Sequence, residues 1–246
     1  MKTLTEFIRD INISTTLTEA RAPMVASKAQ VKEFIEKNFE GAKYEISNRP
    51  NKDGYYEVKL SGRYIEFKGY FWQNGYKPVN ITDDQFVITD INCTTFTIGS
   101  DDDRHRIYGI KGLPDKLNCN LRIRYAYIKN LEDLPHEVQS LYLEYNHWDL
   151  MDLTGLNKCN IKNDLYIAGN NITSIAGLPE KINGKFTLDF NTQLDLKGQE
   201  QYLPKYVGGD CVISRNGEFA KPKGKQYSEK MIAKLIDVKG KISADR

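Results

Sequence analysis

Short apolar triplets recur along the second half of the chain at nearly constant spacing. In each triplet two apolar residues flank a variable one, which is the alternation expected of a strand with one buried face. The outer members should therefore point inward and the middle member outward. The five triplets are Leu121-Arg122-Ile123, Leu141-Tyr142-Leu143, Leu165-Tyr166-Ile167, Phe186-Thr187-Leu188 and Cys211-Val212-Ile213.

Two more apolar ladders share this period. One is formed by Leu113, Leu134, Leu156, Leu178 and Leu203, four of which precede a proline, and the other by Ile107, Ile128, Leu150, Ile172 and Leu194. A unit of about 22 residues has room for one strand and one return arm but hardly for a pair of helices. Asparagines that follow most triplets can bond the backbone at the turn and form a ladder of amides. They are Asn146, Asn170, Asn191 and Asn216.

The segment before these repeats predicts a small module of helix and strands. A helix over residues 28–40 is favoured by Ser27 and Gln30, which are spaced as a capping box, and by Gly41 as its end. Strand patterns follow at residues 44–47, 55–60 and 64–70. Such a module can cover the apolar end of a stack of repeats.

The last residues predict a short helix that closes the other end. Ser228 is its expected cap and Gly240 its stop, with Met231, Ile232, Leu235 and Ile236 facing inward. We divide the chain into residues 20–85 as an α+β cap, 86–220 as the repeat body and 221–246 as a basic tail with a capping helix. Residues 1–19 form a separate N-terminal segment, which a family resemblance identifies as a propeptide.

The repeat pattern resembles the short bacterial type of leucine-rich repeat, most closely in residues 138–146. Ala126 replaces the asparagine of one unit and Asn157 the proline of another. The resemblance implies an α+β fold in which a small N-terminal α/β cap is followed by a leucine-rich-repeat-like parallel β-solenoid of about five to six repeats and a short C-terminal helix. It also implies binding of other macromolecules, often on the face lined by strands.

The N-terminus resembles the capsid-targeting peptide of internal head proteins from T-even-type bacteriophages. Leu4, Phe7, Ile8 and Ile11 follow helical spacing, and Leu17-Thr18-Glu19-Ala20 comes after them. The resemblance implies docking on the prohead scaffold and cleavage by a prohead protease, with Leu17 and Glu19 as the recognition pair and Glu19–Ala20 as the cut bond. The alternative is a frayed helix that docks on the body.

Composition narrows the class of partner. The chain has 35 Lys and Arg residues and 33 Asp and Glu residues, a net charge of +2. This balance argues against a protein dedicated to coating nucleic acid and against a polycationic membrane binder. No apolar run reaches the roughly 18 residues of a membrane span. Residues 221–246 hold eight basic and three acidic residues, or +5. Lys221, Lys223 and Lys225 could contact DNA non-specifically, or this segment could simply be a solvated end.

The sequence contains no pattern that predicts an enzyme, a cofactor or a metal site. It has no GxSxG, HExxH or P-loop motif, its three histidines lack ligand spacing, and its four cysteines form no CxxC. Tyr, Trp and Arg are the residues that anchor protein interfaces, although half of these aromatics could merely pack between units. The candidate binding residues are Arg122, Arg124, Tyr142, Glu144, Tyr145, Trp148, Tyr166 and Asp189.

These observations lead to one preferred function and two alternatives. We expect a non-enzymatic phage protein, packaged in the virion interior and delivered to the host cytoplasm, that binds a host protein and counters host defence. The first alternative is an internal structural protein that contacts packaged DNA through its basic tail. The second is a protein-binding protein of the host cytoplasm without head targeting.

Overall fold

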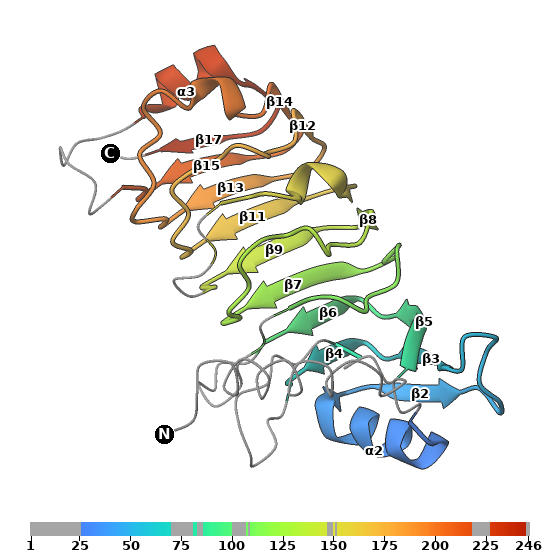
Figure 1. Ribbon diagram of the computed structural model, residues 1–246. Coiled ribbons are helices and arrows are strands. Elements are labelled where there is room, and N and C mark those ends of the chain that lie inside the picture. The colour runs from blue at the N-terminus through green and yellow to red at the C-terminus, as the bar shows by residue number, and fades with distance from the viewer. Residues whose placement is uncertain are drawn as a thin grey trace, which may run out of the picture.

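The computed structural model describes residues 26–69, 81–82, 86–99, 107, 109–146, 150, 152–217 and 227–244. The fold is α+β, and its largest element is a nine-stranded sheet in the order β1-β4-β6-β7-β9-β11-β13-β15-β17. Every neighbouring pair is parallel except β1 with β4 (Figure 1). Its strands are β1 Phe39–Glu40, β4 Tyr64–Phe67, β6 Thr95–Ile98, β7 Asn120–Arg124, β9 Leu141–Glu144, β11 Leu165–Ala168, β13 Phe186–Asp189, β15 Cys211–Ser214 and β17 Ile242–Ala244.

The five apolar triplets form five adjacent strands of this sheet, β7, β9, β11, β13 and β15. Their outer members are aligned, so that Leu121, Leu141, Leu165, Phe186 and Cys211 are neighbours in register. The outer members are all buried, as the alternation predicted. A slip of one residue would turn each apolar pair to the opposite face, so burial fixes the register.

The return arms carry two small sheets beside the main one. The first is a parallel pair of β8 Glu137–Val138 and β10 Asn160–Ile161. The second is a parallel three-stranded sheet of β12 Lys181–Ile182, β14 Tyr206–Val207 and β16 Asp237–Val238. Short 3₁₀ turns occupy Leu156–Lys158 and Glu200–Tyr202. The core lies between the arms and the main sheet, and both predicted ladders are in it: nine of their ten residues are buried, and Leu113 is partly buried against them.

The N-terminal helix α2, Lys28–Asn38, begins as predicted but ends earlier. Ser27 accepts from the Gln30 backbone N–H, and the Gln30 side chain accepts from the Ser27 backbone N–H, which completes the capping box. The predicted end at residue 40 is wrong because Phe39 leaves the helix to pair with Phe67 of β4. The buried Phe39 ring lies 5.0 Å from that of Phe67.

The strands next to α2 are divided between two sheets. A three-stranded sheet contains β2 Lys43–Ile46, β3 Tyr56–Ser61 and β5 Phe86–Asn92, in which β5 runs parallel to β3. Strand β4 instead joins β6 in the nine-stranded sheet. Both sheets therefore take strands from each side of the boundary expected between residues 85 and 86.

The C-terminal helix α3, Glu229–Leu235, is capped by Ser228, whose side chain accepts from the Met231 backbone N–H. Ile232 and Ile236 are buried, as expected, whereas Met231 and Leu235 are 47% and 40% exposed, which corrects the prediction that all four face inward. The chain then continues into β16 and β17, which extend two sheets by one strand each. Figure 1 shows α3 at the end of the sheet opposite α2.

Candidate protein-binding face

The outward side chains of β7, β9, β11, β13 and β15, with the turn residue that follows each strand, form one continuous surface, here called the strand face. Arg122, Tyr142 and Tyr166 are neighbours in register on it, each partly exposed. The Tyr142 and Tyr166 rings lie 6.1 Å apart, and the Arg122 guanidinium lies 5.8 Å from the Tyr142 ring centroid. The structure thus brings together three of the residues selected from the sequence.

Two predicted charges of the strand face form an ion pair with one another. Arg122 Nε lies 3.0 Å from Glu144 Oε2, and Arg122 Nη2 donates to Glu144 Oε1 at 3.1 Å. This fork-to-fork geometry is the strong form of an arginine–carboxylate contact. Arg124 is directed elsewhere, with Nη2 3.9 Å from Glu66 Oε1 on the N-terminal side of the sheet.

Asp189 differs from the expectation of an exposed interface residue. It is only 6% exposed because Arg215 and Ser214 cover its carboxylate. The Ser214 hydroxyl donates to Asp189 Oδ1 at 2.8 Å and Arg215 Nε donates to the same oxygen at 3.0 Å, while Arg215 Nη2 bonds Oδ2. Thr187, also expected to be outward and open, is 4% exposed.

The turn residue after each strand adopts a left-handed backbone. Its φ is +51° at Tyr125, +50° at Tyr145, +54° at Phe190 and +52° at Arg215, and Gly169 occupies the same place after β11 at +67°. For a residue with a side chain this conformation costs roughly 1–2 kcal/mol, which glycine avoids. Four turns therefore carry large side chains where the backbone favours glycine.

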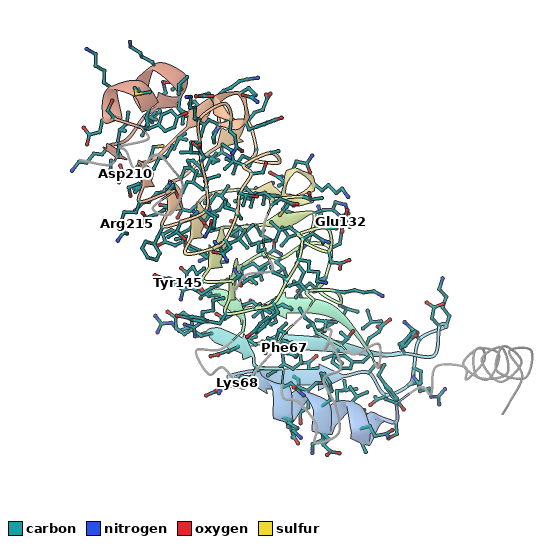
Figure 2. All side chains as sticks on the ribbon, turned by 60° about the vertical axis from the view of Figure 1, so that its left-hand side comes forward. Phe67, Lys68, Glu132, Tyr145, Asp210 and Arg215 are labelled. Atoms are coloured by element: carbon teal, nitrogen blue, oxygen red, sulfur yellow. The ribbon has the colours of Figure 1, made fainter. Side chains whose placement is uncertain are left out.

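These turn residues form a ridge along one edge of the strand face. The Tyr125 and Tyr145 rings stack at 5.7 Å, and the Arg215 guanidinium lies 5.6 Å from the Phe190 centroid. Tyr145 and Phe190 are 48% and 39% exposed. Figure 2 shows Tyr145 and Arg215 on the same side of the molecule, with Glu132 on the other. Only Tyr145 of this ridge was selected from the sequence; the shared place before each asparagine could have identified Phe190 and Arg215.

A ladder of buried asparagines supports the ridge from below, as predicted. Asn170 Oδ1 accepts from the Asn146 backbone N–H at 3.0 Å, and Asn170 Nδ2 donates to the Leu143 carbonyl at 2.9 Å. The same two contacts recur from Asn191 and from Asn216 to the preceding strands. Where Ala126 replaces asparagine, its N–H donates to Asn146 Oδ1 at 3.2 Å.

The electrostatics of the face favour the neutral form of the Tyr166 phenol and the charged form of the Arg215 guanidinium. Partial burial, with Glu144 and Asp189 nearby, raises the pKa of Tyr166 above its usual value. The hydrogen bonds to Asp189 raise the pKa of Arg215. Across the described residues no group of three or more His, Cys, Asp or Glu could hold a metal ion.

Several predicted residues lie outside the described part of the chain. Trp148, the processing residues Leu17, Glu19 and Ala20, and the tail lysines Lys221, Lys223 and Lys225 belong to this group. In the part that is described, no helix is both long and apolar enough to cross a membrane.

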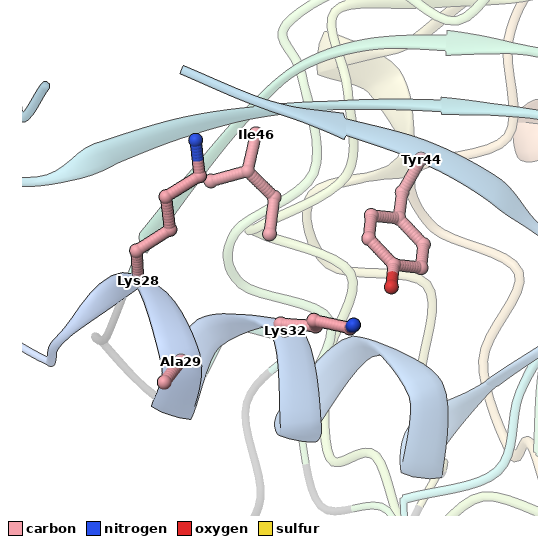
Figure 3. A pocket seen from close by; sticks show the side chains of 5 residues that line it. All are labelled: Lys28, Ala29, Lys32, Tyr44 and Ile46. Atoms are coloured by element: carbon pink, nitrogen blue, oxygen red, sulfur yellow. The ribbon is translucent and has the colours of Figure 1, made fainter. Parts of the chain in front are cut away.

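An open hollow of about 430 Å³ lies between α2 and β2. Figure 3 shows that its lining residues come from the helix, as Lys28, Ala29 and Lys32, and from the strand, as Tyr44 and Ile46. The Tyr44 hydroxyl donates to Glu36 at 2.5 Å, which raises the pKa of Tyr44. Its open shape and small set of polar groups make it a weaker candidate than the strand face.

Comparison of the chain with protein-family models, with curated proteins and with solved structures finds no match.

Proposed function

We propose that the protein is a leucine-rich-repeat-like parallel solenoid that binds another protein through its strand face. The observation that carries the proposal is the aligned row of Arg122, Tyr142 and Tyr166 on adjacent parallel strands. Residues of these types supply large contact areas with polar groups at their ends, and they dominate the energetics of many interfaces.

The solenoid assignment is supported by three repeated features. The buried ladders share one period, the strands pair in register, and each asparagine bonds the preceding unit. A single unit of about 22 residues cannot bury its apolar side chains alone, so its stability depends on its neighbours. Such a stack presents a regular, extended surface to a partner.

The proposed role is recognition and not catalysis. The two carboxylates at the centre of the strand face, Glu144 and Asp189, each form an ion pair with an arginine. In this role they orient Arg122 and Arg215.

The test is capture of a partner from bacterial lysate by the full chain. We expect Tyr142→Ala combined with Tyr166→Ala to abolish capture while the melting temperature changes little. Tyr202→Ala is the matched control, because Tyr202 is an exposed tyrosine in a return arm. Unchanged capture by the double variant would contradict the assignment of the face.

We further propose, from the resemblance of residues 1–20, that the chain is packaged in a phage head and trimmed after Glu19. Its partner would then be a host protein met after delivery. Mass spectrometry of purified virions should detect a chain that begins at Ala20. A chain that is absent from virions, or that keeps residues 1–19 there, would contradict packaging with cleavage.

A further inference from the structure

The ridge of turn residues keeps large side chains at a conformational cost. Tyr145, Phe190 and Arg215 occupy left-handed positions that Gly169 fills in the unit between them. Backbone strain of this kind persists only where the surrounding structure enforces it, and it is frequent at binding sites. Because Tyr145 and Phe190 are substantially exposed, their packing within the protein is an incomplete reason to retain them.

The spacing of the two exposed rings defines a repeat length for a ligand. Strands β9 and β13 both pair with β11, so Tyr145 and Phe190 stand two strands apart. Adjacent strands are about 4.8 Å apart, so the backbones of Tyr145 and Phe190 are separated by about 9.6 Å. The Tyr145 ring lies over Gly169, and the Arg215 guanidinium, held by Asp189 of β13, reaches back over the Phe190 ring.

The polar groups available on the ridge and on the adjoining strand face can donate hydrogen bonds. Tyr142, Tyr145 and Tyr166 carry phenol hydroxyls that can donate, whereas the carboxylates of Glu144 and Asp189 are paired with Arg122 and Arg215. The surface therefore suits a ligand that is rich in acceptors, poor in donors and apolar between them.

A polyproline II segment has this chemistry and this repeat. It rises about 3.1 Å per residue, so prolines three residues apart are separated by about 9.3 Å. Its prolines have no N–H, its carbonyls are free to accept, and its rings pack on aromatic side chains. We propose that the strand face binds a proline-rich segment of its partner in this conformation. Prolines at positions i and i+3 contact Tyr145 and Phe190, while Tyr166, on the strand between them, donates to a carbonyl of the segment.

This inference rests on the proposed binding function and specifies the partner. We would titrate the full chain with a fluorescently labelled peptide of ten prolines and with a Gly-Ser peptide of equal length, measuring anisotropy. We expect saturable binding of the proline peptide at micromolar concentration and at least tenfold weaker binding of the Gly-Ser peptide. Equal binding of both, or no binding of either, would overturn the inference.

Glycine variants separate recognition from structure. Tyr145→Gly and Phe190→Gly should each weaken proline-peptide binding at least tenfold without lowering the melting temperature, because glycine adopts the left-handed turn freely. Tyr202→Ala should bind as the unmodified chain does. Unchanged affinity in both glycine variants would place the peptide elsewhere and overturn the proposal.

The outcomes also distinguish this inference from the proposed function. If Tyr142→Ala with Tyr166→Ala abolishes capture of a protein partner, yet the unmodified chain does not bind the proline peptide, the face binds proteins of another chemistry. Suppose instead that the proline peptide binds through Tyr145 and Phe190, while the change of Tyr142 and Tyr166 to alanine leaves partner capture unchanged. The ridge then binds proline-rich segments and the rest of the strand face does not bind the partner.

Discussion

At the scale of single residues, the asparagine ladder links neighbouring units through buried hydrogen bonds. The amides of Asn170, Asn191 and Asn216 each accept from the N–H of the previous asparagine and donate to a carbonyl at the end of the previous strand. A leucine or alanine at this place would leave both backbone groups without these partners inside the protein. The ladder is therefore a determinant of stability and not only of turn geometry.

Replacing Asn170 with alanine tests this role. The change removes the acceptor of the Asn146 N–H and the donor to Leu143 O. Because an unsatisfied buried group costs about 1–3 kcal/mol, we expect a loss of roughly 2–4 kcal/mol in the free energy of unfolding, measured in urea. Asn183→Ala is the control, since Asn183 is exposed, and should change stability by less than about 0.5 kcal/mol. A similar loss in both variants would contradict the ladder's special contribution.

The buried thiols provide a second prediction at this scale. Burial raises the pKa of both Cys159 and Cys211 to about 12. At pH 8 we expect iodoacetamide to leave both unlabelled in the native protein and to label them in urea, as mass spectrometry would show, because the thiolate is the reactive form. Rapid native labelling of either cysteine would contradict its buried environment.

The same pKa shifts set a direction for stability at alkaline pH. Both folded-state pKa values exceed those of the unfolded chain, so the neutral thiols contribute stability fully below pH about 8.5. That contribution declines as pH rises toward 12, since the unfolded state then binds fewer protons.

At the scale of elements, α3 has two apolar stripes with different surroundings. Ile232 and Ile236 are buried, whereas Met231 and Leu235 are among the most exposed large apolar residues described. The sequence shows four apolar residues in this segment, but their spacing does not determine which side of so short a helix packs against the sheets. Only the positions of β16 and β17 determine that.

Substitutions in adjacent positions of α3 distinguish these stripes. Ile232→Ala should lower the free energy of unfolding by about 2–4 kcal/mol because it opens a cavity in the core. Met231→Ala should change it by less than about 0.5 kcal/mol, since that side chain is already in solvent. Chemical denaturation of the two variants measures the difference, and equal losses would show that Met231 also packs inside.

The sequence was most informative where apolar positions repeated. The strands at Leu121, Leu141 and Leu165 followed from the period, because each unit repeats the burial pattern of the last, and their parallel order was what the leucine-rich-repeat resemblance implied. Strand β17 was missed because Ile242-Ser243-Ala244 has one large apolar residue and lies past the last recognised unit. Strand β4 was predicted, but its place in the main sheet was not, since a strand pattern does not name its partner.

The candidate site was less predictable than the sheet. Alternation placed Arg122, Tyr142 and Tyr166 on one face, yet it could not foresee that Arg215 would cover Asp189. A tyrosine, phenylalanine or arginine also does not predict a left-handed turn, because these residues rarely adopt that conformation. Gly99 and Gly169, just after two of the strands, were the local signal of that geometry.

At the scale of the whole molecule, one apolar layer runs through all the units between the main sheet and the arms. Leu143 lies near its middle, fully buried and aligned with Ile123 and Ile167 of the adjacent strands. In a stack where each unit contacts only its neighbours, damage at a central unit uncouples the two halves. In the proposed solenoid, stability therefore belongs to the stack and not to any single unit.

Leu143→Asp should accordingly unfold the described body. An unpaired carboxylate in this layer loses its hydration without gaining a partner, and we expect a loss of more than about 4 kcal/mol, enough to abolish cooperative melting in circular dichroism. Tyr142→Asp is the matched control, because the neighbouring side chain of the same strand faces the partly exposed surface and its carboxylate keeps contact with water. That variant should fold and melt cooperatively while losing partner capture. If Leu143→Asp also stayed folded and soluble, the side chains of this strand would have to point the other way, and the strand face would be the interior of the protein.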